Sequence, residues 1–264
     1  MKTHTETLPP DAESSESERR TRRLLKIFLM VGQPDVGKSF MSHIIADRGQ
    51  LVARKDVLLC DNEEGTNLVF TRLAPTRIHP IKLYSETDVN DLITRMEEKG
   101  YDYAFVDTKG SSLVAVRRAC GNFDDLTDCQ VQVVACIVVG TRENSEVVGH
   151  DWLDILKPLE KIYWIWNDQK FDEDHPSKQD NRQLPENLPC DRSKIQEIRI
   201  PPLQNIYSRE IITLGVPFSR VVAGLVPESQ ILSHRTAKVK ISRWLEVTHK
   251  ALEPIIAELN GSPA

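Results

Sequence analysis

The sequence contains one short stretch whose residue types and spacing suit it to holding phosphate. Residues 31–40 read VGQPDVGKSF, which fits the pattern Gly-x-x-x-x-Gly-Lys-Ser. In such a loop the backbone N–H groups of 35–39 wrap the phosphates, and the positive end of the following helix adds to their hold. Lys38 would neutralise the β and γ oxygens, and the Ser39 hydroxyl would ligate Mg²⁺. The predicted nucleotide-binding residues are Gly32, Gln33, Pro34, Asp35, Val36, Gly37, Lys38, Ser39 and Phe40.

Acidic residues follow two other apolar runs. Asp107 closes the run YAFV at 103–106, the Walker B pattern in which a carboxylate supports Mg²⁺ directly or through water. Asp61 and Glu63 follow the run VLLC at 57–60 and could hold a metal-bound water or orient the attacking water. A solvated acidic turn is the alternative for that pair. We predict Lys38, Glu63 and Asp107 as catalytic residues, and Ser39, Asp61 and Asp107 as metal ligands.

The base-binding side is less well defined by the sequence. Asn167 closes the apolar run IYWIW, and its amide could read an adenine edge; a turn-forming asparagine is an equal alternative. The chain has no NKxD segment for reading guanine, which favours ATP over GTP. The four tryptophans lie in apolar periodic contexts and are expected in the core rather than stacked on a base; they are Trp152, Trp164, Trp166 and Trp244.

Strand-like and helix-like patterns alternate along the chain and would position these groups. This alternation is typical of βαβ units, so we predict an α/β fold of three layers with a mostly parallel sheet and helices on both faces. Such sheets bind ligands beyond the carboxyl ends of their strands, where the motifs fall. The expected strands are 25–31, 57–60, 81–84, 103–106, 131–140, 161–167 and 195–202, and the expected helices are 39–47, 88–100 and 144–159.

The chain divides into a polar tail and one domain. Residues 1–23 have almost no apolar content and are expected to be disordered, whereas 24–264 form the nucleotide-binding domain. Residues 168–194 are polar and rich in proline, which indicates an excursion loop. Residues 229–259 are expected to form a long helix that Pro254 kinks or breaks. Its inward residues would be Ile231, Leu232, Val239, Trp244, Leu245, Leu252 and Ile256.

Composition limits the class of protein. The chain has 264 residues, a formal charge of −5 and a pI of about 5.9, which argues against nucleic-acid binding over the whole surface. The longest apolar run, 131–140, is too short to span a bilayer, and five cysteines without CxxC spacing indicate free thiols in a reducing cytoplasm. The basic end of the tail could contact DNA weakly, or acidic lipid, or could simply be solvated; it consists of Arg19, Arg20, Arg22 and Arg23.

The order of the motifs resembles the ParA/MinD family of ATPases, and within it most closely the TraL-type conjugal transfer proteins of plasmids. The resemblance covers about 25–250. It implies a cytoplasmic ATPase, encoded on a mobile element, that serves DNA transfer or maintenance. The segments that carry it are LKIFLMVGQPDVGKSFMSHIIAD, LLCDNEEGTN, FVDTKGSSLVAV and IRIPPLQNIYSREIITLGVPFSRVV.

The resemblance also assigns roles by position. Asp61 and Asp107 would support the metal, and Glu63 would occupy the place of the family's water-orienting aspartate. Asn167 and Pro201 would border the base. The cofactors implied are ATP and Mg²⁺, and the partners are a second copy of the chain in a nucleotide-dependent homodimer and a conjugation or partition protein.

The phosphate loop departs from the family pattern at three positions. The family has a lysine that reaches the partner's phosphates where this chain has the neutral Gln33. Two glycines of the family are replaced by Pro34, which lacks an N–H, and by Asp35, whose charge would cost about 1 kcal/mol at ~4 Å from a solvated phosphate unless it points outward. We therefore expect nucleotide binding with slow hydrolysis. Lys109 could supply the missing charge, although a surface lysine is the simpler interpretation.

Four functions remain open from the sequence. The first is a ParA/MinD-like ATP-binding protein with weak or partner-stimulated ATPase activity in conjugation. The others are a plasmid partition ATPase, a non-hydrolysing nucleotide-switched scaffold, and a small-molecule kinase. A kinase needs an arginine-rich lid, and 168–194 contains only Arg182 and Arg192.

Overall fold

A computed structural model describes the chain at residues 24–53, 57–61, 78–80, 83, 85–108, 113–119, 123–169, 182–226 and 229–259. The predicted tail at 1–23, including its arginines, lies outside these residues, as do Glu63 and Lys109. Within the described part no helix is long and apolar enough to cross a membrane.

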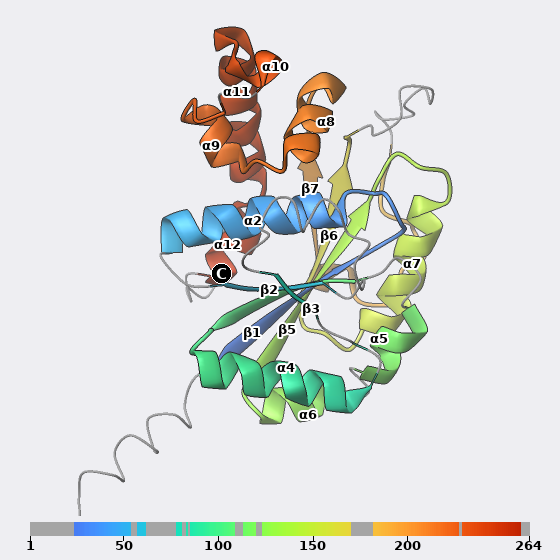
Figure 1. Ribbon diagram of the computed structural model, residues 1–264. Helices are drawn as coiled ribbons and strands as arrows, with labels where there is room; N and C mark the ends of the chain where they lie inside the picture. Colours follow the sequence, from blue (N-terminus) through green and yellow to red (C-terminus); the bar gives the residue numbers. More distant parts are fainter. Residues whose placement is uncertain are drawn as a thin grey trace, which may run out of the picture.

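Seven strands form one sheet in the order β3-β2-β4-β1-β5-β6-β7, and all six pairings are parallel. The central strand β1 lies between β4 and β5, so the chain builds one half of the sheet and then crosses to the other (Figure 1). The predicted fold class is confirmed. The strands are β1 (Leu25–Val31), β2 (Val57–Asp61), β3 (Ile78–Pro80), β4 (Tyr103–Asp107), β5 (Val131–Val139), β6 (Ile162–Asn167) and β7 (Ile195–Ile200).

Helices cover both faces of the sheet. One face carries α2 (Lys38–Ala53), α11 (Arg235–Ala251) and α12 (Glu253–Leu259), and the other carries α4 (Glu86–Lys99), α5 (Leu113–Ala119), α6 (Phe123–Asp128) and α7 (Ser145–Leu156). Because side chains alternate along a strand, β1 sends Phe28 and Met30 to the first face and Ile27 and Leu29 to the second. This two-sided burial explains why β1 is apolar at every position except Lys26.

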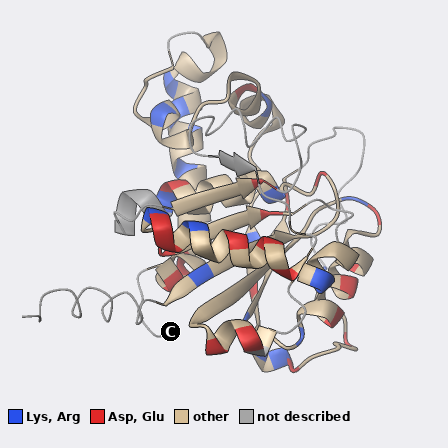
Figure 2. Cartoon of the chain, turned by 60° about the horizontal axis from the view of Figure 1, so that its bottom comes forward, with Lys and Arg blue, Asp and Glu red and all other residues tan. Residues whose placement is uncertain are grey.

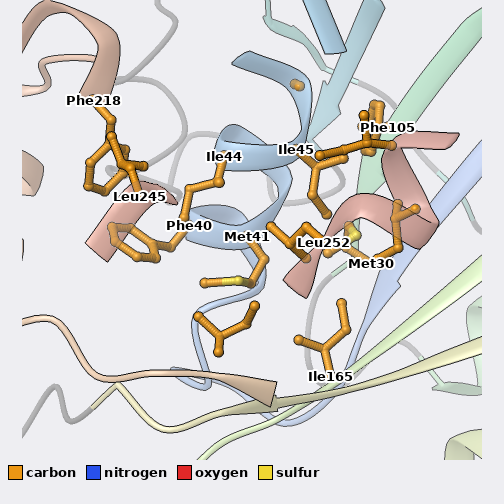
Figure 3. Close-up of a cluster of buried hydrophobic side chains, with 14 of the residues drawn as sticks. Met30, Phe40, Met41, Ile44, Ile45, Phe105, Ile165, Phe218, Leu245 and Leu252 are labelled. Carbon is orange, nitrogen blue, oxygen red and sulfur yellow. The ribbon is translucent and has the colours of Figure 1, made fainter. Parts of the chain in front are cut away.

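The first face joins the phosphate-loop helix to the C-terminal helices. Phe40 of α2 packs edge-on to Phe218, with 5.2 Å between ring centroids, and lies 6.0 Å from the Trp244 ring. Phe218 belongs to α9 (Phe218–Val222), which with α8 (Asn205–Leu214) and α11 projects above the sheet (Figure 1). Figure 3 shows side chains of α2 lying between these helices and the strands, among them Phe40, Met41, Ile44 and Ile45.

The tryptophans are core residues, as predicted. Trp152, Trp164 and Trp166 are at most 1% exposed, and Trp244 is 7% exposed. Trp164 and Trp166 contact each other at 5.5 Å, and Gly149 of α7 lets that helix approach because a Cβ there would lie 2.7 Å from the Trp164 ring. The apolar pattern of these segments therefore predicted the burial of the tryptophans correctly.

The helix predicted at 88–100 is confirmed as α4, with slightly earlier bounds. Its N-terminus has a capping box between Ser85 and Asp88, and its C-terminus ends at Gly100 with φ 74°. The strand predicted at 81–84 is tested only at Leu83, because the other three residues lie outside the described part of the chain. The strand is β3 at Ile78–Pro80, and Leu83 is buried without being in a strand. An edge strand can end in proline because one side of its backbone needs no partner, and a short apolar run does not reveal this shift.

The single helix predicted at 229–259 is three helices: α10 (Gln230–Ser233), α11 and α12. Pro254 does break the helix as predicted, since α11 ends at Ala251 and α12 begins at Glu253. Val239 was expected inward but is 42% exposed. It lies about 160° around the helix from Ile241, which is buried, so both cannot face the core.

Candidate nucleotide-binding site

The phosphate loop connects β1 to α2 in the conformation that the motif requires. Gly32 has φ 139° and Gly37 has φ 91°, values that residues with a side chain rarely adopt. A Cβ at Gly32 would overlap the carbonyl oxygen of Val138 in β5. The two glycines are therefore needed both for the turn and for the close approach of the loop to the sheet.

Lys38 folds back over the loop. Its Nζ donates to the carbonyl oxygen of Gln33 at 3.0 Å, and the residue is 8% exposed. In the first turn of α2, the Ser42 hydroxyl donates to the Lys38 carbonyl at 3.1 Å. The ammonium group is thus held above the backbone N–H groups that would wrap the phosphates.

Two predicted metal ligands meet at the ends of neighbouring strands. Asp61 and Asp107 are register partners in the β2–β4 ladder, and Met30 of β1 is the register partner of Asp107 on its other side. Both carboxylates are buried, at 5% and 2% exposed. The Ser39 hydroxyl donates to the Asp107 carboxylate, which ties the loop to β4. The structure therefore brings together Lys38, Ser39, Asp61 and Asp107.

This donor set fits Mg²⁺ bound together with a triphosphate. Among the described residues no group of three or more His, Cys, Asp or Glu could hold a metal by itself. Mg²⁺ in nucleotide sites is usually held by one or two carboxylates plus phosphate oxygens and waters, and Ser39 with Asp107 provides that number of protein donors. Glu63, the predicted water-orienting residue, is outside the described residues.

Asn167 supports the loop from β6. The residue is fully buried; its Nδ2 donates to the Val36 carbonyl at 2.7 Å, and its Oδ1 accepts from the Gln169 backbone N–H at 3.2 Å. Both ends of the amide are thus bonded to the protein itself. Pro201, at the end of β7, accepts the Trp244 indole N–H at 2.7 Å through its carbonyl. Both residues lie at the carboxyl ends of their strands, where the sequence placed them.

Two residues that the sequence did not single out hold the same loop. Gly140 packs on Val36, because a Cβ there would lie 3.0 Å from the valine side chain. Arg182 donates from Nη1 to the Gly140 carbonyl at 2.7 Å, pairs with Asp168 and lies 5.2 Å from the centre of the Trp166 ring. Because Arg182 lies in a polar segment, nothing in the sequence indicates that its side chain is buried. Its contacts with Gly140, Asp168 and Trp166 could therefore not be predicted.

Two of the three departures from the expected pattern, at Asp35 and Gln33, have a clear geometry. Asp35 has φ 60°, and its side chain points outward, 67% exposed, where it pairs with Arg142 at 2.9 Å. Gln33 donates from Nε2 to the Glu143 carbonyl at 3.3 Å. The turn that follows β5, residues 140–144, therefore lies against the phosphate loop. The Asp35 carboxylate points away from the loop interior. It therefore avoids the repulsion of a bound phosphate that an inward carboxylate would cause.

His43 lies in α2 one turn after Ser39. It is 4% exposed, and burial lowers its pKa from 6.5 to about 4. The folded protein therefore excludes a proton that the unfolded chain binds between those two pH values. The folded state keeps His43 neutral at neutral pH.

We expect the free energy of unfolding to fall as the pH is lowered from about 6.5 to 4. The His43 contribution alone reaches about 3 kcal/mol, at ~1.36 kcal/mol per pH unit over that interval. His249, whose pKa is also lowered by burial and then by Arg48, acts in the same direction. Urea unfolding at pH 7 and pH 4.5 measures the effect, and His43→Leu should flatten the profile. An unchanged slope in that variant would contradict the assignment.

Comparison with known proteins found likenesses among solved structures. A ParA-family ATPase from Chlorobium tepidum is 17% identical with a TM-score of 0.46, covering 85% of this chain and 98% of that one. The cell division protein MinD from Aquifex aeolicus is 16% identical with a TM-score of 0.45, covering 84% and 97%. MinD from Pyrococcus furiosus is 14% identical with a TM-score of 0.43, covering 84% and 98%. Neither a protein-family model nor a curated protein matches the chain. At these values the likeness does not transfer an activity.

Proposed function

We propose that the chain is an ATP-binding protein of the ParA/MinD kind that hydrolyses ATP slowly. The observation that carries the proposal is the conformation of the loop 32–39, with Lys38 folded over it and Ser39 bonded to Asp107. Loops of this shape expose successive backbone N–H groups to an anion at the start of a helix. The resemblance in the sequence supports the same conclusion.

The proposed roles follow from position. Lys38 would bind the β and γ phosphates, and Ser39 and Asp107, with Asp61 on the adjacent strand end, would hold Mg²⁺. Mg²⁺ supplies charge neutralisation for the triphosphate. Asn167 acts through Val36, keeping the loop in its binding conformation, and Pro201 borders the base. Glu63 is proposed to orient the attacking water.

Slow turnover is proposed because Gln33 brings no positive charge to the phosphates. Positioned cations commonly contribute factors of about 10³–10⁵ to phosphoryl transfer. The deciding experiment is calorimetric titration with ATP, ADP and GTP, with and without Mg²⁺, followed by a phosphate-release assay. Mg²⁺-dependent binding of ATP in preference to GTP with slow release is expected. Absence of ATP binding would refute the proposal.

Within this function, we propose a role in conjugal DNA transfer, a cytoplasmic location and a nucleotide-dependent homodimer. The support is the TraL-like sequence of residues 198–222, part of which forms α8 and α9. A measurement of plasmid transfer frequency and plasmid loss with a Lys38→Ala allele separates transfer from maintenance. Light scattering with and without ATP tests the homodimer.

A plasmid partition ATPase is the second candidate, and one surface favours it. Helix α11 carries five basic residues and one acidic residue although the whole chain has a charge of −5. Figure 2 shows several Lys and Arg close together on the projecting helices, whereas basic and acidic residues are mixed around the sheet. The basic residues are Arg235, Lys238, Lys240, Arg243 and Lys250.

If this surface binds DNA, the affinity should be independent of sequence and fall steeply with salt. Arg235→Glu combined with Arg243→Glu should weaken binding and reduce the salt slope by about two phosphate contacts, each contributing about 0.9 to the slope. Fluorescence anisotropy of a short duplex at several salt concentrations measures this. Comparison with a chain that begins at Leu24 separates α11 from the basic tail. Binding that survives both changes would refute both assignments.

The remaining alternatives have less support. A small-molecule kinase needs mobile arginines over the phosphates, but Arg182 is bonded to Gly140 and Asp168, and Arg192 pairs with Glu197. A non-hydrolysing scaffold is distinguished by the phosphate-release assay alone.

A further inference from the structure

An exposed arginine is held at the rim of the phosphate loop by one of the loop's own residues. The Arg142 guanidinium lies 2.9 Å from the Asp35 carboxylate, and the two side chains are 46% and 67% exposed. Asp35 is two residues before Gly37, within the stretch whose backbone N–H groups would face the phosphates. Its carboxylate points away from that stretch, and Arg142 meets it there.

The backbone that carries Arg142 is fixed. The Gly140 N–H donates to the Ser145 hydroxyl at 2.9 Å, and the Ser145 N–H donates to the Arg142 carbonyl at 3.2 Å. Gln33 of the phosphate loop bonds to the next carbonyl, that of Glu143, at 3.3 Å. The backbone at Arg142 is therefore anchored beside the loop, while the side chain is half exposed.

We propose that Arg142 is a ligand of the terminal phosphate of ATP, and that Asp35 pairs with its guanidinium until ATP binds. This proposal rests on the proposed function. An exposed ion pair contributes little to stability, so releasing Arg142 from Asp35 costs little. A terminal phosphate offers more charge than one carboxylate, and it accepts the two parallel N–H bonds that a guanidinium donates. Arg142 then supplies charge at the rim of the loop, where Gln33 supplies none.

This arrangement makes Asp35 a competitor of the γ-phosphate for the same guanidinium. ADP lacks the γ-phosphate and leaves the Arg142–Asp35 pair intact. The pair should therefore set the preference of the site for ATP over ADP. Removing Arg142 should weaken ATP binding, and removing Asp35 should strengthen it. The affinity for ADP should stay unchanged in both cases.

The test measures dissociation constants for Mg²⁺ with ADP and with a non-hydrolysable ATP analogue by calorimetry. Arg142→Gln should weaken the analogue roughly tenfold, the lower range for a lost charge-assisted hydrogen bond, with ADP unchanged. Asp35→Asn should strengthen binding of the analogue by a few fold, because the carboxylate that competes for Arg142 is removed. Asparagine is the suitable replacement because it tolerates the positive φ of this position. In the double variant the Asp35→Asn gain should disappear, since Arg142 is no longer present to be released.

The matched control is Lys157→Gln, directly after α7, which removes an ion pair to Asp154 of the same length, 2.9 Å, and of similar exposure. It should change neither affinity. Equal loss of ATP analogue and ADP in Arg142→Gln, or no loss of either, overturns the role of Arg142 while leaving the proposed function intact. A parent protein that binds neither nucleotide overturns the proposed function itself.

Discussion

Lys38→Ala is expected to abolish the stabilisation that ATP gives to the parent protein. At a concentration one hundred times its Kd, ATP would stabilise the folded parent by about 2.7 kcal/mol, a rise in melting temperature of roughly 5–10 °C for a domain of this size. Lys38 lies over the loop with its ammonium bonded to the Gln33 carbonyl, so its removal takes away the main cation facing the phosphates. Differential scanning fluorimetry with Mg²⁺ and ATP measures the shift.

The control for this variant is Lys99→Ala, at the exposed end of α4, which should keep the full ATP shift. The ATP shift is measured from the melting temperature of each variant without nucleotide, because Lys38→Ala also loses the hydrogen bond to the Gln33 carbonyl. A full ATP shift in Lys38→Ala would remove the loop from the nucleotide site.

Glu258→Ala is expected to lower the free energy of unfolding by about 3 kcal/mol. Glu258 of α12 accepts from Lys26 of β1 at 2.9 Å, from Lys161 at 2.8 Å and from the Tyr163 hydroxyl at 3.2 Å. Removing one member of a buried ion pair leaves its partner charged and largely without water, which costs ~3–5 kcal/mol. Chemical denaturation at pH 7 measures the loss.

Two further variants test the cause. Glu246→Ala, on the exposed side of α11, should change stability by less than about 0.5 kcal/mol. Lys26→Met combined with Glu258→Leu should recover much of the loss, because replacing a buried pair by apolar residues is often neutral. A Glu258→Ala variant as stable as the parent would show that the network contributes nothing.

The same network contributes stability only above acidic pH. Burial by itself would raise the pKa of Glu258, but hydrogen bonds from Lys161 and Lys26 outweigh it and lower the pKa below the ordinary value of 4.5. The contribution is therefore complete above that value and is lost as the pH falls through the lower pKa of the folded state. This window overlaps the lower end of the one in which His43 acts, so the Glu258→Ala and His43→Leu variants are needed to separate the two contributions.

Six of the seven strands and the phosphate loop were predictable because each was marked by a local pattern; the edge strand β3 was not. β1, β4, β5 and β6 are buried on both faces, and a strand of that kind reads as an apolar run whatever its neighbours. The glycines of the loop are needed by its backbone angles, so the motif and the geometry agree. Asp61 and Asp107 came together because parallel strands end at the same edge.

The parts that the sequence missed depend on partners far away in the chain. Arg182 is buried by Gly140, Asp168 and Trp166, and nothing near it in sequence indicates those contacts. The inward face of α11 could not be read correctly because the break before Arg235 resets the helical phase, which misplaced Val239. Asp35 and Arg142 are also far apart in the sequence, and no pattern near either residue indicates that they pair.

The bond between Lys26 and Glu258 also has a consequence for how the chain acquires its structure. The two residues are 232 positions apart, and the apolar side of α2 is covered by α11 and α12. During synthesis β1 and α2 emerge early, yet Phe40, Met41 and Ile44 cannot be covered until residues near 245–256 have been made. Contacts of such long range slow folding and leave apolar surface open to aggregation in the interval. The apolar side of α2 is therefore expected to stay exposed during synthesis until α11 and α12 pack against it.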